Sequence, residues 1–220
     1  MSETAAADVT RVLLVDDQEL VRTGFTMILA VEDDIEVVGE ARDGAEAVSQ
    51  VAALAPDVVL MDVQMPGTDG IEATRAVVAA HPETKVVILT TFDDDAYLFD
   101  ALQAGASGFL LKNCPPDDLV HAIRLAAGGH SLLAPEVTER VIGRSARTPR
   151  TEDPRLAELT ERERDVLMAM ARGMSNAEIA TDLVVSAATV KSHVSRILTK
   201  LDSRDRVQAV ILAHESGLMD

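Results

Sequence analysis

Five short runs of aliphatic and β-branched residues recur in the first part of the chain, and amphipathic stretches of helical length separate them. The runs cover 12–15, 35–39, 57–61, 85–89 and 108–111, and the stretches lie near 18–30, 44–54, 69–80, 95–104 and 116–127. Near-continuous apolar strands that alternate with helices are typical of a parallel sheet covered on both faces. The pattern predicts a doubly wound α/β domain with a five-stranded parallel sheet, for which the strand order 2-1-3-4-5 is a common solution.

Polar side chains stand where several of these strands end. Asp16 and Asp17 follow the first run, Asp62 follows the third, Thr90 the fourth and Lys112 the fifth. Strands 1 and 3 are neighbours in the predicted order, so three carboxylates, a hydroxyl and an ammonium group should meet at one edge of the sheet. Such oxygen ligands suit Mg²⁺, and a carboxylate beside a divalent cation can accept a phosphoryl group. The alternative for the acid pair is a plain helix cap.

The last 65 residues or so have the pattern of four short helices. Capping-box sequences at 160–163 and 175–178 open two apolar-periodic runs, a third helix spans 186–201, and Ser203 is placed to cap a fourth. A turn between the second and third helices indicates a helix-turn-helix. The third helix leaves several polar side chains available to a partner: Lys191, Ser192, Ser195, Arg196 and Lys200.

Charge is unevenly distributed along the chain, whose formal net charge is −17. The first 150 residues hold 25 acidic and 11 basic side chains, whereas residues 186–206 hold five basic and two acidic ones. The acidic residues are therefore concentrated in the first part of the chain, and the late segment is locally basic. No apolar run approaches the ~20 residues of a membrane-spanning helix, no secretory signal is visible, and the single cysteine, Cys114, excludes an internal disulfide. These features predict a cytoplasmic protein without membrane association.

Four segments resemble the receiver domain of bacterial two-component response regulators: RVLLVDDQ, VVLMDVQMPGTDGIEATR, VVILTTFDDD and AGASGFLLK. The resemblance covers residues 9–130 and implies a flavodoxin-like fold. It also implies that Asp62 is the phospho-acceptor. Mg²⁺ would be held by Asp17, Asp62 and the backbone carbonyl of Gln64, with Asp16 acting mainly through a bound water.

The same resemblance implies a switch beside the acceptor. Thr90 and Lys112 match the switch hydroxyl and the lysine that pairs with the phosphoryl group, and Phe109 stands where the family has a rotating aromatic residue. Phe109 is equally well explained as a core residue. Asn113 replaces the proline that many receivers carry after this lysine, so a cis bond at this position stays open.

The segment LTERERDVLMAMARGMSNAEIATDLVVSAATVKSHVSRILTKL resembles the LuxR/NarL-type DNA-binding domain, over residues 156–220. By this resemblance the third helix enters the major groove, with Lys191, Ser192 and Ser195 toward bases or phosphates. Arg196 and Lys200 either contact phosphates or form a solvated face. Residues 131–155 are predicted to be a linker with a short helix near 135–142.

Together the two resemblances imply a transcription regulator and not an enzyme. The expected partners are a cognate sensor histidine kinase, a double-stranded DNA operator and, after phosphorylation, a second copy of the chain. A phosphatase of the aspartyl-phosphate type would need an acid two residues after Asp62, where Gln64 stands. A phosphorylation-independent DNA binder, with the first domain as a dimerisation scaffold, is the other alternative.

Overall fold

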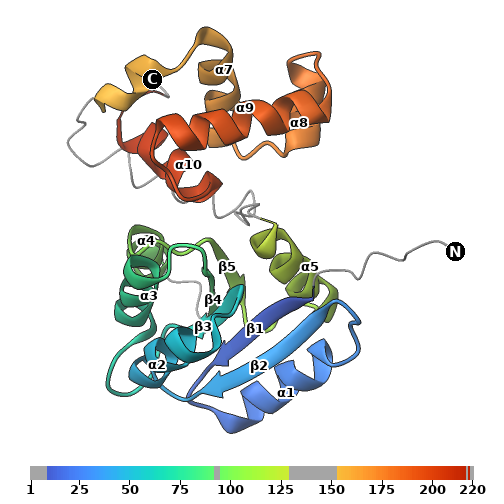
Figure 1. Ribbon diagram of the computed structural model, residues 1–220, viewed down its shortest axis with the longest axis vertical. Coiled ribbons are helices and arrows are strands. Elements are labelled where there is room, and N and C mark those ends of the chain that lie inside the picture. Colours follow the sequence, from blue (N-terminus) through green and yellow to red (C-terminus); the bar gives the residue numbers. More distant parts are fainter. Residues whose placement is uncertain (1–8, 92–94, 129–152, 217, 219–220) are drawn as a thin grey trace, which may run out of the picture. The chain divides into compact units, whose positions relative to one another are not determined.

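The computed structural model describes residues 9–91, 95–128, 153–216 and 218. The chain divides into two compact units, Met1–Gly129 and His130–Asp220. The first unit carries a five-stranded sheet whose strands are all parallel and lie in the order β2-β1-β3-β4-β5, which confirms the predicted order (Figure 1). The short helix predicted near 135–142 lies outside the described residues.

The elements follow the predicted runs closely. The strands are β1 (Thr10–Val15), β2 (Ile35–Ala41), β3 (Val58–Asp62), β4 (Lys85–Thr90) and β5 (Gly108–Leu111). The helices of the first unit are α1 (Glu19–Leu29), α2 (Gly44–Leu54), α3 (Gly70–Ala80), α4 (Asp95–Gln103) and α5 (Pro116–Ala127).

Helices cover both faces of this sheet, with α1 and α5 on one side and α2, α3 and α4 on the other (Figure 1). Side chains alternate along each strand, so Val12 and Leu14 of β1 join one apolar cluster with Phe25, Leu29 and Ile123 of α1 and α5. The residues between them are buried against the opposite face. Burial on both faces explains why the strands read as continuous apolar runs.

A glycine makes the loop after β3 possible. The amide of Gly70 donates a hydrogen bond to the carbonyl oxygen of Val63 at 3.0 Å. A Cβ atom on Gly70 would stand 1.8 Å from the backbone oxygen of Asp62, so no other residue fits without moving the end of β3. Asp69 caps α3 by accepting from the amide of Glu72 at 2.8 Å.

The second unit is helical around its own apolar core. Its elements are η1 (Pro154–Glu158), α7 (Glu161–Ala171), α8 (Asn176–Asp182), α9 (Ala187–Lys200) and α10 (Arg206–Glu215). Both predicted capping boxes are formed, and Ser186 caps α9. None of the helices in the described ranges has the length and apolar character needed to cross a membrane.

The predicted cap of the fourth helix of this unit is wrong. Asp205, and not Ser203, precedes α10 and accepts a hydrogen bond from the amide of Gln208 at 3.1 Å. Ser203 lies two residues earlier, where its hydroxyl is 3.5 Å from the carbonyl oxygen of Leu201. Both residue types cap helices well, so the sequence alone did not separate them.

Candidate functional site

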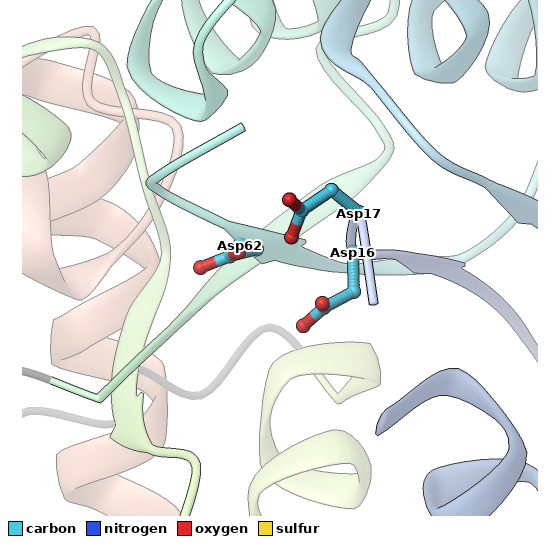
Figure 2. Close-up of side chains that lie close together, drawn as sticks. All are labelled: Asp16, Asp17 and Asp62. Atoms are coloured by element: carbon cyan, nitrogen blue, oxygen red, sulfur yellow. The ribbon is translucent and has the colours of Figure 1, made fainter. Parts of the chain in front are cut away.

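Three carboxylates gather at the carboxyl ends of β1 and β3 (Figure 2). One oxygen of each of Asp16, Asp17 and Asp62 lies within 4.8 Å of the others. Asp16 and Asp62 are buried, with 2% and 4% of their surface exposed, whereas Asp17 is open to solvent. The site therefore has two fixed acids inside and one acid at its mouth.

Lys112 connects the two buried acids. Its ammonium nitrogen lies 2.5 Å from Asp16 Oδ2 and 2.9 Å from Asp62 Oδ2, and its side chain is 8% exposed. The backbone amide of Lys112 donates to the carbonyl oxygen of Thr90 at 2.8 Å, which holds the end of β5 beside the end of β4. Three carboxylates and one ammonium group leave two net negative charges, which one divalent cation would balance.

Asp16 also shapes the start of α1. Its backbone amide donates to the carbonyl oxygen of Ala41 at 3.1 Å, and its Oδ1 accepts from the amide of Gln18 at 2.9 Å. Gln18 is the residue that precedes α1, and its own side chain makes no capping bond. One oxygen of Asp16 thus supports the loop before α1, and the other faces the pocket. Neither Asp16 nor Asp17 is the capping residue of α1, so the structure does not have the plain helix cap considered as the alternative.

Burial and the pairing of opposite charges together shift the pKa values of Asp62 and Lys112. Desolvation raises the pKa of Asp62, the hydrogen bond and charge of Lys112 oppose this shift, and the nearby charge of Asp16 adds to it. For Lys112, desolvation lowers the pKa, but the hydrogen bonds to Asp16 and Asp62 outweigh it and the net shift is upward. The single positive charge of Lys112 does not balance the negative charges of the acids, and this imbalance favours binding of a cation.

The donor set fits Mg²⁺. An octahedral ion with ligands at about 2.1 Å needs oxygens roughly 3–4 Å apart, which small movements of these side chains supply. Asp16 Oδ2 is buried and lies 2.5 Å from the ammonium nitrogen of Lys112, at the centre of the pocket. The backbone of Gln64 lies beside the site, since its amide is 3.4 Å from Asp62 Oδ1. Hard oxygen donors of this kind select Mg²⁺ over softer metals.

Two further predicted residues lie on the neighbouring strands. Thr90 is buried at the end of β4, on the same edge as the acids. Phe109 is buried on β5, opposite Ile88 of β4 in the strand register. The packing of Phe109 accounts for it as a core residue, and its role as a moving aromatic residue stays a prediction.

Most of the basic side chains that the structure describes in the second unit, over residues 153–216, bind within that unit. Arginines close several helix ends by donating to backbone carbonyl oxygens, as Arg155 does to Leu201 at 2.6 Å and Arg162 to Leu183 at 2.6 Å. Within residues 153–216, the basic side chains that are exposed and form no ion pair are Arg172, Lys191 and Arg196.

The α9 helix presents four of the five predicted contact residues to solvent: Lys191, Ser192, Ser195 and Arg196. Lys200 differs, because its ammonium nitrogen lies 2.7 Å from Glu163 Oε2 and 3.0 Å from the carbonyl oxygen of Glu158. This bonding argues against a phosphate contact by Lys200. Its partner is 37 residues away in the sequence, so no local pattern indicated it.

Comparison with known families separates the same two parts. Residues 12–124 match the response regulator receiver domain, and residues 157–213 match the luxR family of bacterial regulatory proteins. The chain belongs to the LuxR-type response regulators. Within this family its acidic pocket lies in the receiver domain, and α9 lies in the DNA-binding domain.

This response regulator is similar over almost its whole length to several relatives. It is 45% identical over 214 residues to the transcriptional regulatory protein YxjL of Bacillus subtilis, covering 96% of this chain and 98% of that protein. It is 41% identical to VraR of Staphylococcus aureus, with 95% and 98% covered. The crystal structure of the response regulator ChrA from a heme-sensing two-component system is 40% identical, with a TM-score of 0.53 and coverage of 96% and 99%.

Proposed function

We propose that a sensor histidine kinase phosphorylates Asp62 of this response regulator in the presence of Mg²⁺, and that phosphorylation controls binding of α9 to an operator. The observation that carries the proposal is the convergence of Asp16, Asp17, Asp62 and Lys112 in one pocket. A DNA target places the protein in the bacterial cytoplasm. Similar regulators are named as transcriptional regulatory proteins and not as enzymes.

Residues of the pocket have distinct tasks in this reaction. An oxygen of Asp62 forms a bond to phosphorus while the bond from phosphorus to the kinase's histidine nitrogen breaks, and that nitrogen keeps the electron pair and takes a proton. Asp16, Asp17, Asp62 and the backbone carbonyl of Gln64 would hold Mg²⁺, which offsets negative charge on the phosphoryl group. Lys112, already 2.9 Å from Asp62, moves to pair with the phosphoryl oxygens.

The change of charge at Asp62 biases the receiver between two arrangements. A phosphoryl group adds about 1.5 to 2 negative charges and strong acceptor oxygens. Thr90 turns its hydroxyl toward these oxygens, and Phe109 on the adjacent strand fills the space that Thr90 leaves. The altered face around α4, β5 and α5 then releases the DNA-binding domain, promotes dimerisation, or does both.

Dimerisation suits the modest charge of the DNA-binding domain. Two of the predicted α9 contacts, Lys191 and Arg196, are exposed basic side chains, so one copy has few phosphate contacts. Two copies on adjacent half-sites combine their affinities through effective concentration. Phosphorylation that favours a dimer would therefore increase operator affinity without any new contact in each copy.

Phosphoryl uptake tests the proposal directly. The full chain is incubated with a small acyl phosphate and Mg²⁺, and the intact mass is compared for wild type, Asp62→Asn and Asp69→Asn. Wild type and Asp69→Asn should each gain one phosphoryl group, since asparagine caps α3 as well as aspartate does. Uptake that persists in Asp62→Asn would remove Asp62 as the acceptor.

A further inference from the structure

An arginine of α1 contacts the backbone of the acidic pocket. Arg22 Nη1 donates to the carbonyl oxygen of Asp16 at 2.8 Å, and Arg22 Nε donates to Glu40 Oε2 at 2.8 Å. The Arg22 side chain is 15% exposed, whereas that of Glu40, at the end of β2, is 42% exposed. The guanidinium group is therefore held between a strand carboxylate and the first acid of the site.

The contact with Arg22 affects the direction of both acids that follow β1. The peptide group that joins Asp16 to Asp17 is rigid and planar, so the direction of the Asp16 carbonyl sets the rotation of the bonds on either side of it. Those rotations fix where the Asp17 side chain leaves the backbone. Asp17 is exposed, so little packing corrects its direction if the peptide group turns.

We propose that Arg22 is a positioning residue for the cation site, and that Glu40 orients its guanidinium group. Arg22 holds the peptide group between Asp16 and Asp17 so that both carboxylates, together with Asp62, face one ion. This inference rests on the proposed function, because it assumes that the three carboxylates bind a divalent cation. Groups that orient metal ligands typically change metal affinity by about 10- to 100-fold when removed.

Charge alone predicts the opposite result for this residue. Removal of a positive charge near a cation site should tighten cation binding, since it lowers the electrostatic repulsion. Removal of a positioning contact should weaken binding. The sign of the change in affinity therefore separates the two roles of Arg22.

The experiment titrates the full chain with Mn²⁺, an ion of similar ligand preference, and measures free Mn²⁺ by electron paramagnetic resonance. The variants are Arg22→Ala, Arg22→Lys and Arg42→Ala. Arg42 is the matched control, because it directly follows β2 near this edge of the sheet and its side chain is exposed, with an ion pair to Glu46 at 3.6 Å. Arg22→Ala should bind Mn²⁺ at least ~10-fold more weakly, whereas Arg42→Ala should bind equally or slightly more tightly.

Arg22→Lys keeps the charge but offers one ammonium group in place of a fork that serves two acceptors. Its affinity should fall between those of wild type and Arg22→Ala. If Arg22→Ala fails to fold, as judged by circular dichroism, Arg22→Lys carries the test, and wild-type affinity in that variant overturns the inference. Unchanged or tighter binding by folded Arg22→Ala overturns it as well. Absence of Mn²⁺ binding by wild type would instead refute the metal site of the proposed function.

Discussion

Replacement of Lys112 by methionine should destabilise the receiver domain and make its stability depend more strongly on Mg²⁺ than that of wild type. In the structure one ammonium group serves two buried carboxylates, at 2.5 Å and 2.9 Å. Methionine preserves most of the volume but leaves Asp16 and Asp62 facing each other without a cation. Removal of one partner from a buried ion pair costs about 3–5 kcal/mol, and we expect about 3 kcal/mol because Asp17 opens the site to water.

Magnesium should reverse most of this loss. The pocket of the variant has three net negative charges instead of two, so it should bind the ion more tightly than wild type does. An ion present at 100 times its dissociation constant stabilises the folded state by about 2.7 kcal/mol. For a domain of this size, ~3 kcal/mol corresponds to a change in Tm of about 10 °C. In a chelator, Lys112→Met should therefore have a Tm about 10 °C below that of wild type. Addition of Mg²⁺ should raise the Tm of the variant by most of this difference.

The assay is thermal unfolding followed by circular dichroism, with a chelator and with saturating Mg²⁺. Lys85→Met is the control, because Lys85 begins β4 at the opposite edge of the sheet. This control should show the same Mg²⁺ response as wild type. Equal Tm values of Lys112→Met and wild type in chelator, or an equal gain from Mg²⁺ in both, would refute the charge balance inferred for the pocket.

Three other changes test particular contacts. Gly70→Ala should lower the free energy of unfolding in urea by at least ~2 kcal/mol and reduce phosphoryl uptake, because the new Cβ would stand 1.8 Å from the Asp62 oxygen; an unchanged urea midpoint would contradict this. The hydrogen bond from Lys200 and the Thr160 amide lower the pKa of Glu163 to about 2, below its ordinary value of 4.5, so wild type should lose stability as pH falls from about 4.5 to about 2. Glu163→Gln should be less stable than wild type near neutral pH and should not show this loss of stability in acid. If the stability of the two proteins depends on pH in the same way, the role given to Glu163 is wrong. Val184→Asn should raise Tm by the equivalent of about 1 kcal/mol, since φ of 53° disfavours a β-branched residue that asparagine replaces easily; a lower Tm would mean that the valine makes a needed contact.

Local patterns predicted the sheet and the convergence of its polar residues. The apolar runs gave β1 and β3, and the common strand order made these strands neighbours, which brings Asp16 and Asp62 together. Both steps depend on periodicity and on the geometry of parallel sheets, which a single sequence contains. The capping boxes of α7 and α8 were predictable for the same reason, because the bonded residues are three apart.

Contacts between distant residues were not predictable in this way. Arg22 is one more polar residue of an amphipathic helix until the fold brings Glu40, 18 residues away, to its guanidinium group. Lys200 belongs by sequence to the basic face of α9, yet its ammonium group binds Glu163 of α7. Arg206 was counted in the same basic segment, but it donates to Asn176 and to the carbonyl oxygen of Met174. The choice among possible partners is made by tertiary packing, which local spacing does not encode.

Operator affinity with and without a phosphodonor tests the central claim most directly. Fragments are first selected from random DNA with the phosphorylated chain, and binding of the selected fragment is then measured at fixed salt for wild type and Asp62→Asn. Wild type should bind at least ~10-fold more tightly after treatment with the phosphodonor and Mg²⁺, as expected when a second half-site is engaged, and Asp62→Asn should not respond. Equal affinity of wild type in both states would contradict control by phosphorylation and favour a receiver that serves only as a scaffold.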